Sequence, residues 1–322
     1  MLAFVVGLHV LGFGLARVAS DAPGGLALAG LVVAAYSFGV RHAFDADHIA
    51  AIDNTTRTLT TARTRPVSVG LWFSLGHSSI VLLLVGAVAA GVRSVSGTLA
   101  DEASWLRILG GLVGTAASGL FLCAIGIVNL VALREVVRAR RVWRETGVLD
   151  ADAGRPRGLL ARVLLPALRR VGRPWHMYLV GVLFGLGFDT ASEIGLLALA
   201  AGAGTTALPW YGVLSLPIVF AAGMSLFDTL DGVIMSRAYG WALEDPLRKL
   251  TYNVVVTAVS VAVALGVGAV ELIGIVVERV GGPSWLDAVA GLDLGWIGVT
   301  LASAFAGLWL WIGLVRRRPT SS

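Results

Sequence analysis

The sequence has 322 residues, of which 57% are hydrophobic and 14% are charged, and its mean hydropathy is +0.82. A soluble globular domain carries about 25% charged residues, so this composition excludes that class. The net charge of +5 would suit a nucleic-acid-binding protein, but the basic residues lie between apolar segments, where membrane topology explains them better. A single cysteine, Cys123, excludes a disulfide framework and a paired-cysteine metal site.

The apolar residues are grouped in segments long enough to cross a bilayer, which takes about 20 residues per helix. We therefore expect one all-α membrane domain over residues 1–322 with eight transmembrane helices, separated by Gly- and Pro-containing connections. An alternative interpretation of the first segment is a signal peptide, although the segment lacks the basic region with which signal peptides begin. The expected helices cover residues 2–19, 27–52, 67–92, 106–133, 175–201, 209–236, 251–277 and 293–315.

Basic residues alternate between the two sides of this arrangement. Twenty of the 25 follow the second, fourth, sixth and eighth segments, and eleven of these are arginines between Arg134 and Arg173, whereas four lie on the opposite side. Because cytoplasmic loops are rich in Lys and Arg, both termini and the Arg-rich loop at 134–174 are expected in the cytoplasm. We interpret this loop as a linker whose arginines meet anionic lipid headgroups, with a regulatory or partner-binding role as the alternative.

The second segment ends in a dense group of histidines and carboxylates, because residues 41–53 read Arg-His-Ala-Phe-Asp-Ala-Asp-His-Ile-Ala-Ala-Ile-Asp. Charges in hydrocarbon are costly, and imidazole with carboxylate is a ligand set for divalent transition metals. On an ideal helix His42, Asp45 and His48 project within about 120° of one another, whereas Asp47 points away. Asp47 therefore either supports the ligands or marks a helix distortion, which is tolerated where backbone lines a cavity. The alternative is ordinary wet surface at the helix end.

Polar residues also interrupt three further apolar segments. His77 lies among serines in the third, where it is either a metal ligand or an interhelical hydrogen-bonding group. Asp189 and Glu193 share a face of the fifth helix at a spacing of four, and Asp228 and Asp231 share a face of the sixth at a spacing of three. As anions these four cannot face lipid, so we expect them inside the bundle along a transport pathway, with structural packing contacts as the alternative.

A short string recurs along the chain. Phe-Asp-Thr occurs at 188–190 and 227–229, and Phe-Asp-Ala occurs at 44–46. The second and sixth helices take the same place and direction in two four-helix halves. The recurrence suggests two four-helix repeats, and transporters often place their site at such a repeat interface.

These motifs resemble those of the nickel/cobalt transporter family, whose members are secondary permeases with eight transmembrane helices and cytoplasmic termini. Residues 41–49 match the family's second-helix signature throughout, and further patterns in the third, fifth and sixth helices match residues 75–78, 186–193 and 223–231. The match covers most of the chain, in the expected order.

By position, the resemblance implicates His42, Asp47 and His48 most strongly in metal recognition. Asp45 and His77 come next, and the remaining acids follow, namely Asp189, Glu193, Asp228 and Asp231.

The resemblance implies a permease that imports Ni²⁺ or Co²⁺ across the bacterial plasma membrane, with the ion as substrate and no prosthetic cofactor. The chain has no Gly-x-x-x-x-Gly-Lys motif, so we expect that it does not hydrolyse ATP itself. We also expect no ATPase subunit as a partner. Efflux is the first alternative, although the 134–174 loop lacks the histidines that efflux relatives often carry. A membrane metalloenzyme or a subunit of an ATP-driven importer are the others.

Overall fold

The structure is a computed structural model, and it describes residues 1–23, 25–61, 66–89, 105–146, 172–187, 191–204, 208–242 and 246–292, together with 294, 296–300, 303 and 307. Within these ranges the chain forms helices and short connections without a strand, which confirms the all-α class. The elements are α1 (Leu2–Ser20), α2 (Gly25–Ala43), α3 (Ala46–Thr61), α4 (Val69–Ala89), α6 (Trp105–Thr146), η2 (Pro174–His176), α8 (Met177–Phe184), α9 (Ala191–Gly204), α10 (Trp210–Ala242), α11 (Pro246–Val280) and α12 (Ser284–Ala290).

The described helices account for several membrane spans. Helices α1, α4, α6, α10 and α11 are long and apolar enough to cross a bilayer, and the bent pair α2 and α3 makes a sixth span if it is counted as one. The expected fifth helix is interrupted, because α8 ends at Phe184 and α9 begins at Ala191. Most of the expected eighth helix, 293–315, lies outside the described residues, as does 147–171 of the Arg-rich loop. The count of eight stays a prediction.

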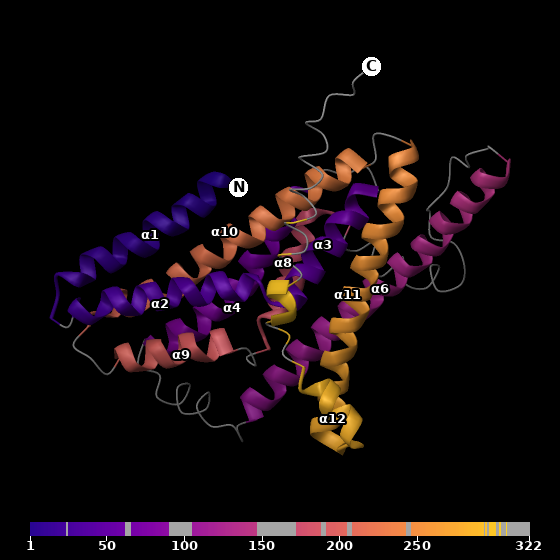
Figure 1. The fold of residues 1–322 in the computed structure, drawn as a ribbon. Helices are drawn as coiled ribbons and strands as arrows, with labels where there is room; N and C mark the ends of the chain where they lie inside the picture. The colour runs from indigo at the N-terminus through magenta and orange to yellow at the C-terminus, as the bar shows by residue number, and fades with distance from the viewer. Residues whose placement is uncertain are drawn as a thin grey trace.

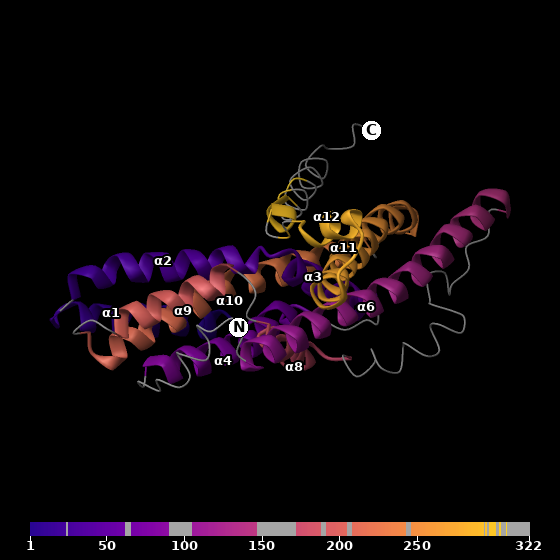
Figure 2. The same ribbon diagram turned by 90° about the horizontal axis from the view of Figure 1, so that it is seen from below.

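The helices are arranged around α10 and around a second pair. Helix α10 packs against α1, α2 and α4, and α9 lies against α2 and α4 (Figure 1). Helices α6 and α11 pack along each other on the other side of the molecule, next to α12 (Figure 2). Helix α3 contacts α10, α11 and α6, so it lies where the two groups meet.

Glycines allow α4 and α10 to approach closely at the centre of the bundle. A Cβ atom added to Gly70 of α4 would overlap the backbone carbonyl of Asp228 on α10, and one added to Gly39 of α2 would overlap that of Phe220. Small residues at such crossings are the usual route to close helix packing in membranes, where van der Waals contact drives association. These crossings bring the histidine on α4 and the carboxylate on α10 to the same part of the interior.

A bend of 51° separates α2 from α3. The backbone N–H groups of Phe44 and Asp45 donate to the carbonyls of Arg41 and His42, each 3.0 Å away, which tightens the last turn of α2. The carbonyl of Asp45 then accepts from the N–H of Ile49 at 3.2 Å and starts α3. The expected second helix is therefore distorted within its polar motif, as one of the two alternatives for Asp47 required.

Helix α3 is polar, and neighbouring helices bury it. The Asn54 side chain donates to the carbonyl of Ala50 and accepts from Asn129 of α6, at 2.8 and 2.7 Å. The Asp53 carboxylate accepts a hydrogen bond from the hydroxyl of Tyr239 on α10. These bonds satisfy polar groups that lipid could not, so α3 remains within the protein interior.

Gly70→Ala should destabilise the folded protein by about 1–3 kcal/mol, because the added methyl group overpacks the crossing of α4 and α10. Gly30→Ala is the matched control, since nothing lies within 4 Å of a Cβ atom at that helical position. Thermal unfolding in detergent measures both variants. Equal unfolding temperatures for the two would contradict the proposed close contact.

Candidate metal centre

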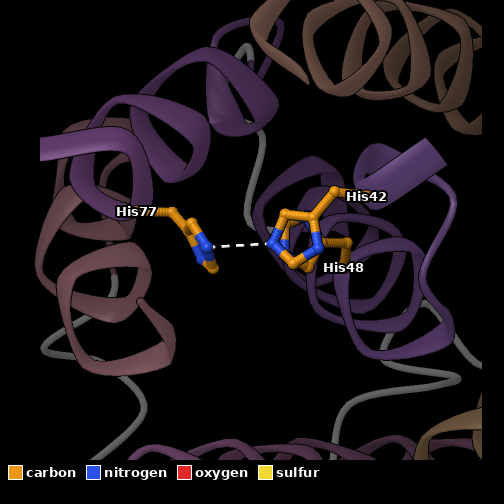
Figure 3. A group of neighbouring side chains, drawn as sticks. All are labelled: His42, His48 and His77. Atoms are coloured by element: carbon orange, nitrogen blue, oxygen red, sulfur yellow. Dashed lines mark hydrogen bonds between the residues drawn. The ribbon is translucent and has the colours of Figure 1, made fainter. Parts of the chain in front are cut away.

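Three histidines from three helices meet in the interior. His42 is the last residue but one of α2, His48 lies in the first turn of α3, and His77 lies in the middle of α4. Their ring centroids are 4.5 to 5.0 Å apart. One nitrogen from each ring lies within 4.8 Å of the other two. Figure 3 shows His77 pointing across the gap toward His42, with His48 beside it. The three histidine residues are 1%, 0% and 2% exposed, so they are not wet surface at a helix end.

The Asp45 carboxylate orients the ring of His42. Asp45 lies in the break between α2 and α3, and its Oδ2 is 2.8 Å from Nδ1 of His42. The opposite nitrogen, Nε2, then points to Nε2 of His77 at 2.9 Å. A carboxylate on the far nitrogen is the usual partner of a metal-binding imidazole, because it fixes the tautomer and raises the basicity of the ligand.

Carboxylates from α9 and α10 complete the group. Oε1 of Glu193 lies 2.8 Å from Nε2 of His77 and 3.8 Å from Nε2 of His42. Oδ2 of Asp228 lies 3.6 Å from Nδ1 of His48. The structure thus brings Glu193 and Asp228, which the sequence predicted for the pathway, against the histidines.

The remaining predicted residues lie at its margin or outside the description. Oδ1 of Asp47 accepts from the backbone N–H of His48 at 2.9 Å, in the first turn of α3. Asp231 lies one turn beyond Asp228 on α10, and its Oδ2 has no hydrogen-bond partner among the described residues. Asp189 lies outside the described residues.

The helix break adds its own electrostatics. The C-terminal end of a helix carries about half a negative charge, and α2 ends at Ala43, directly beside His42. Transporters use such half-helix ends to face cations at the centre of a membrane. The positive N-terminal end of α3 carries Asp47 in its first turn, which offsets it.

A cavity of about 460 Å³ reaches the cluster from the side of α6, α11 and α12. His42, His77 and Glu193 line its inner part, together with Asp45 and Asp47. The cluster is therefore buried and lies directly against this cavity.

Sequence reasoning missed some of the residues around the centre. The ring of Phe73 on α4 is perpendicular to that of His48, with 4.7 Å between the ring centroids. The ring centroid of Phe220 on α10 lies 5.6 Å from that of His42. Neither aromatic residue was singled out from the sequence. Glu271, near the end of the seventh expected segment, is 9% exposed and lines the cavity.

Similar proteins were found at high identity. The profile of the family described as "High-affinity nickel-transport protein" matches residues 28–315. The nickel transporter NicT of Mycobacterium tuberculosis is 46% identical over 96% of this chain and 86% of its own length. The nickel transporter NixA of Staphylococcus aureus is 42% identical over 98% and 92%. The cobalt transport protein NhlF of Rhodococcus rhodochrous is 45% identical over 84% and 78%.

No solved structure matches the chain. The sequence profile covers most of the chain, and the relatives are aligned over nearly their full length. This agrees with the resemblance seen in the motifs and places the chain among transporters rather than enzymes. The chain belongs to the family of high-affinity nickel-transport proteins.

Proposed function

We propose that this protein imports Ni²⁺ or Co²⁺ and holds the ion between His42, His48 and His77. The observation that carries the proposal is the convergence of three imidazoles from α2, α3 and α4 on one buried point. A purely structural cluster would satisfy its own polar atoms. Here both ring nitrogens of His48 and both carboxylate oxygens of Asp228 lack hydrogen-bond partners among the described residues.

The separations suit an octahedral ion. Metal–nitrogen bonds of about 2.1 Å put neighbouring ligand atoms about 3 Å apart. The distances between Nε2 of His77 and its two neighbours, Nε2 of His42 and Oε1 of Glu193, are 2.9 and 2.8 Å. The separation between Nε2 of His42 and Oε1 of Glu193 is 3.8 Å, and the His48 nitrogen lies within 4.8 Å of the other two histidine nitrogens, so these ligands would draw closer together around an ion.

The acids take different roles in this scheme. Asp45 orients His42, and Glu193 is close enough to join the ligands. Asp47 supports the start of α3 and faces the cavity. Asp228 balances charge beside His48, and Asp231 continues the pathway along α10. Asp189, which lies outside the described residues, is proposed to act on the same pathway.

The donor set favours the proposed substrates. Imidazoles and carboxylates without a thiolate suit Ni²⁺ or Co²⁺ better than Cu⁺. Relatives named for nickel and for cobalt have similar identity to this chain, so both ions are candidates. The Irving–Williams order gives nickel the modest advantage.

The membrane potential can drive the import. Moving a dication inward gains about 4.6 kcal/mol at 100 mV, inside negative, because each charge gains about 2.3 kcal/mol. We propose a location in the plasma membrane, with both termini and the 134–174 loop in the cytoplasm and no ATPase subunit. Efflux is the second candidate, and the direction of nickel movement in cells decides between them.

His48→Ala should abolish nickel uptake, because it removes a ligand that no described neighbour can replace. Asp45→Asn should weaken apparent affinity about 10–100-fold, the usual effect of losing a partner behind a ligand. Radioactive nickel and cobalt uptake at nanomolar concentrations, each with the other ion as competitor, measures both effects. His176→Ala is the control, since that ring packs on Trp175 outside the cluster. Wild-type uptake by His48→Ala at normal protein level would refute the site.

The orientation can be tested with thiol labelling, since Cys123 is the only cysteine. In a Cys123→Ala background, Gly154→Cys should react with a membrane-impermeant reagent only after permeabilisation. Ala22→Cys, between the first two helices, should react in intact cells. The reverse pattern would invert the assignment of sides.

A further inference from the structure

The cavity beside the histidines contains a carboxylate that the metal cluster does not use. Glu271 of α11 lines the cavity, and residues Thr115 and Ser118 of α6 lie in the same wall. Glu271 is 9% exposed and Ser118 is 4% exposed, so neither is an ordinary surface group. A glutamate held in an apolar helix at this depth is a functional candidate by default.

Two polar atoms around the cavity lack hydrogen bonds. The hydroxyl of Ser118 and Nδ1 of His77 are buried and have no partner among the described residues. Both residues line the cavity. Buried polar atoms are normally satisfied, so a hydrated ligand in the cavity would supply the partners that these two atoms lack.

The charge of the cavity favours a cation. Four carboxylates line it, from Asp45, Asp47, Glu193 and Glu271, whereas Arg41 is the basic residue among its described lining. A cleft lined mainly by one sign of charge concentrates the opposite ion and raises association rates about 10–10³-fold.

The volume suits a hydrated ion rather than a bare one. Six waters occupy about 180 Å³ at about 30 Å³ each, the shell of an octahedral dication. The cavity of about 460 Å³ holds that shell with room to spare. Glu271 lies nine residues before the end of α11 at Val280, and Thr115 lies ten residues after the start of α6 at Trp105. Both of these helix ends face outside in the proposed orientation.

We propose that Glu271, with Ser118 and Thr115, forms an entry site that captures the hydrated dication before the histidines remove its water. The inference rests on the proposed import function and adds a site one step earlier in the pathway. The side chains of this site contact the water molecules around the ion rather than the ion itself. The site therefore recognises charge and size, whereas the histidines select the metal by direct coordination.

Uptake kinetics test this entry site with Glu271→Gln, which removes the charge and keeps the shape. We expect the apparent KM to rise about tenfold for nickel and for cobalt alike, with the maximal rate within about twofold of wild type. Glu271→Asp should restore most of the affinity. Glu278→Gln is the matched control, because Glu278 is exposed on the same helix. A wild-type KM, or a loss confined to maximal rate or protein level, would overturn the entry site.

A binding measurement separates this inference from the transport function. Purified Glu271→Gln protein should bind as much nickel as wild type, but associate about tenfold more slowly at low ionic strength. High salt should narrow the difference, since screening weakens steering. An unchanged association rate would overturn the entry site even if the protein transports nickel. Nickel binding without uptake by the wild type would instead count against import.

Discussion

The hydrogen bond between Asp45 and His42 is the contact on which the centre depends. It ties the end of α2 to the break that precedes α3, and it turns Nε2 of His42 toward His77 and Glu193. In an uninterrupted helix His42 and His48 would lie six residues apart along one face. The bend of 51° instead brings their rings to 4.5 Å and places the negative end of α2 beside them.

This arrangement places a polar helix, α3, in the interior of a membrane protein. Helix α3 carries buried Asp53, Asn54 and Arg57, which lipid would not tolerate. Bonds to Tyr239 and Asn129 bury it between α10 and α6, and glycine crossings hold α4 close to α10. The packing of the bundle therefore buries the polar helix α3 and separates it from lipid.

Much of this was accessible from the sequence, because membrane segments and their polar interruptions are both explicit in residue types. The apolar blocks gave the all-α class, and His42 and His48 were proposed from charged groups placed in hydrocarbon. His77 was one of two alternatives that the family resemblance favoured. The break itself was only one of two alternatives, since no proline or glycine marks residues 44 and 45. Ideal-helix geometry could not give the turn that joins Asp45 to His42.

The contacts between helices that lie far apart in the sequence were harder to predict. Glu193 and Asp228 were expected only along a pathway, because nothing in their local sequence fixes which histidine each one faces. The burial of Glu271 follows from the packing of α6 and α12 beside α11, which its local sequence does not show. The two-repeat arrangement stays a prediction, since most of the last expected helix lies outside the described residues.

X-ray absorption spectroscopy of purified, nickel-loaded protein would test the central claim most directly. The account predicts a shell of nitrogen and oxygen ligands with the outer scattering of about three imidazoles, because His42, His48 and His77 converge within 4.8 Å. Replacement of His48 should remove one imidazole from that pattern. An all-oxygen shell, or an unchanged spectrum after replacement of all three histidines, would contradict the account.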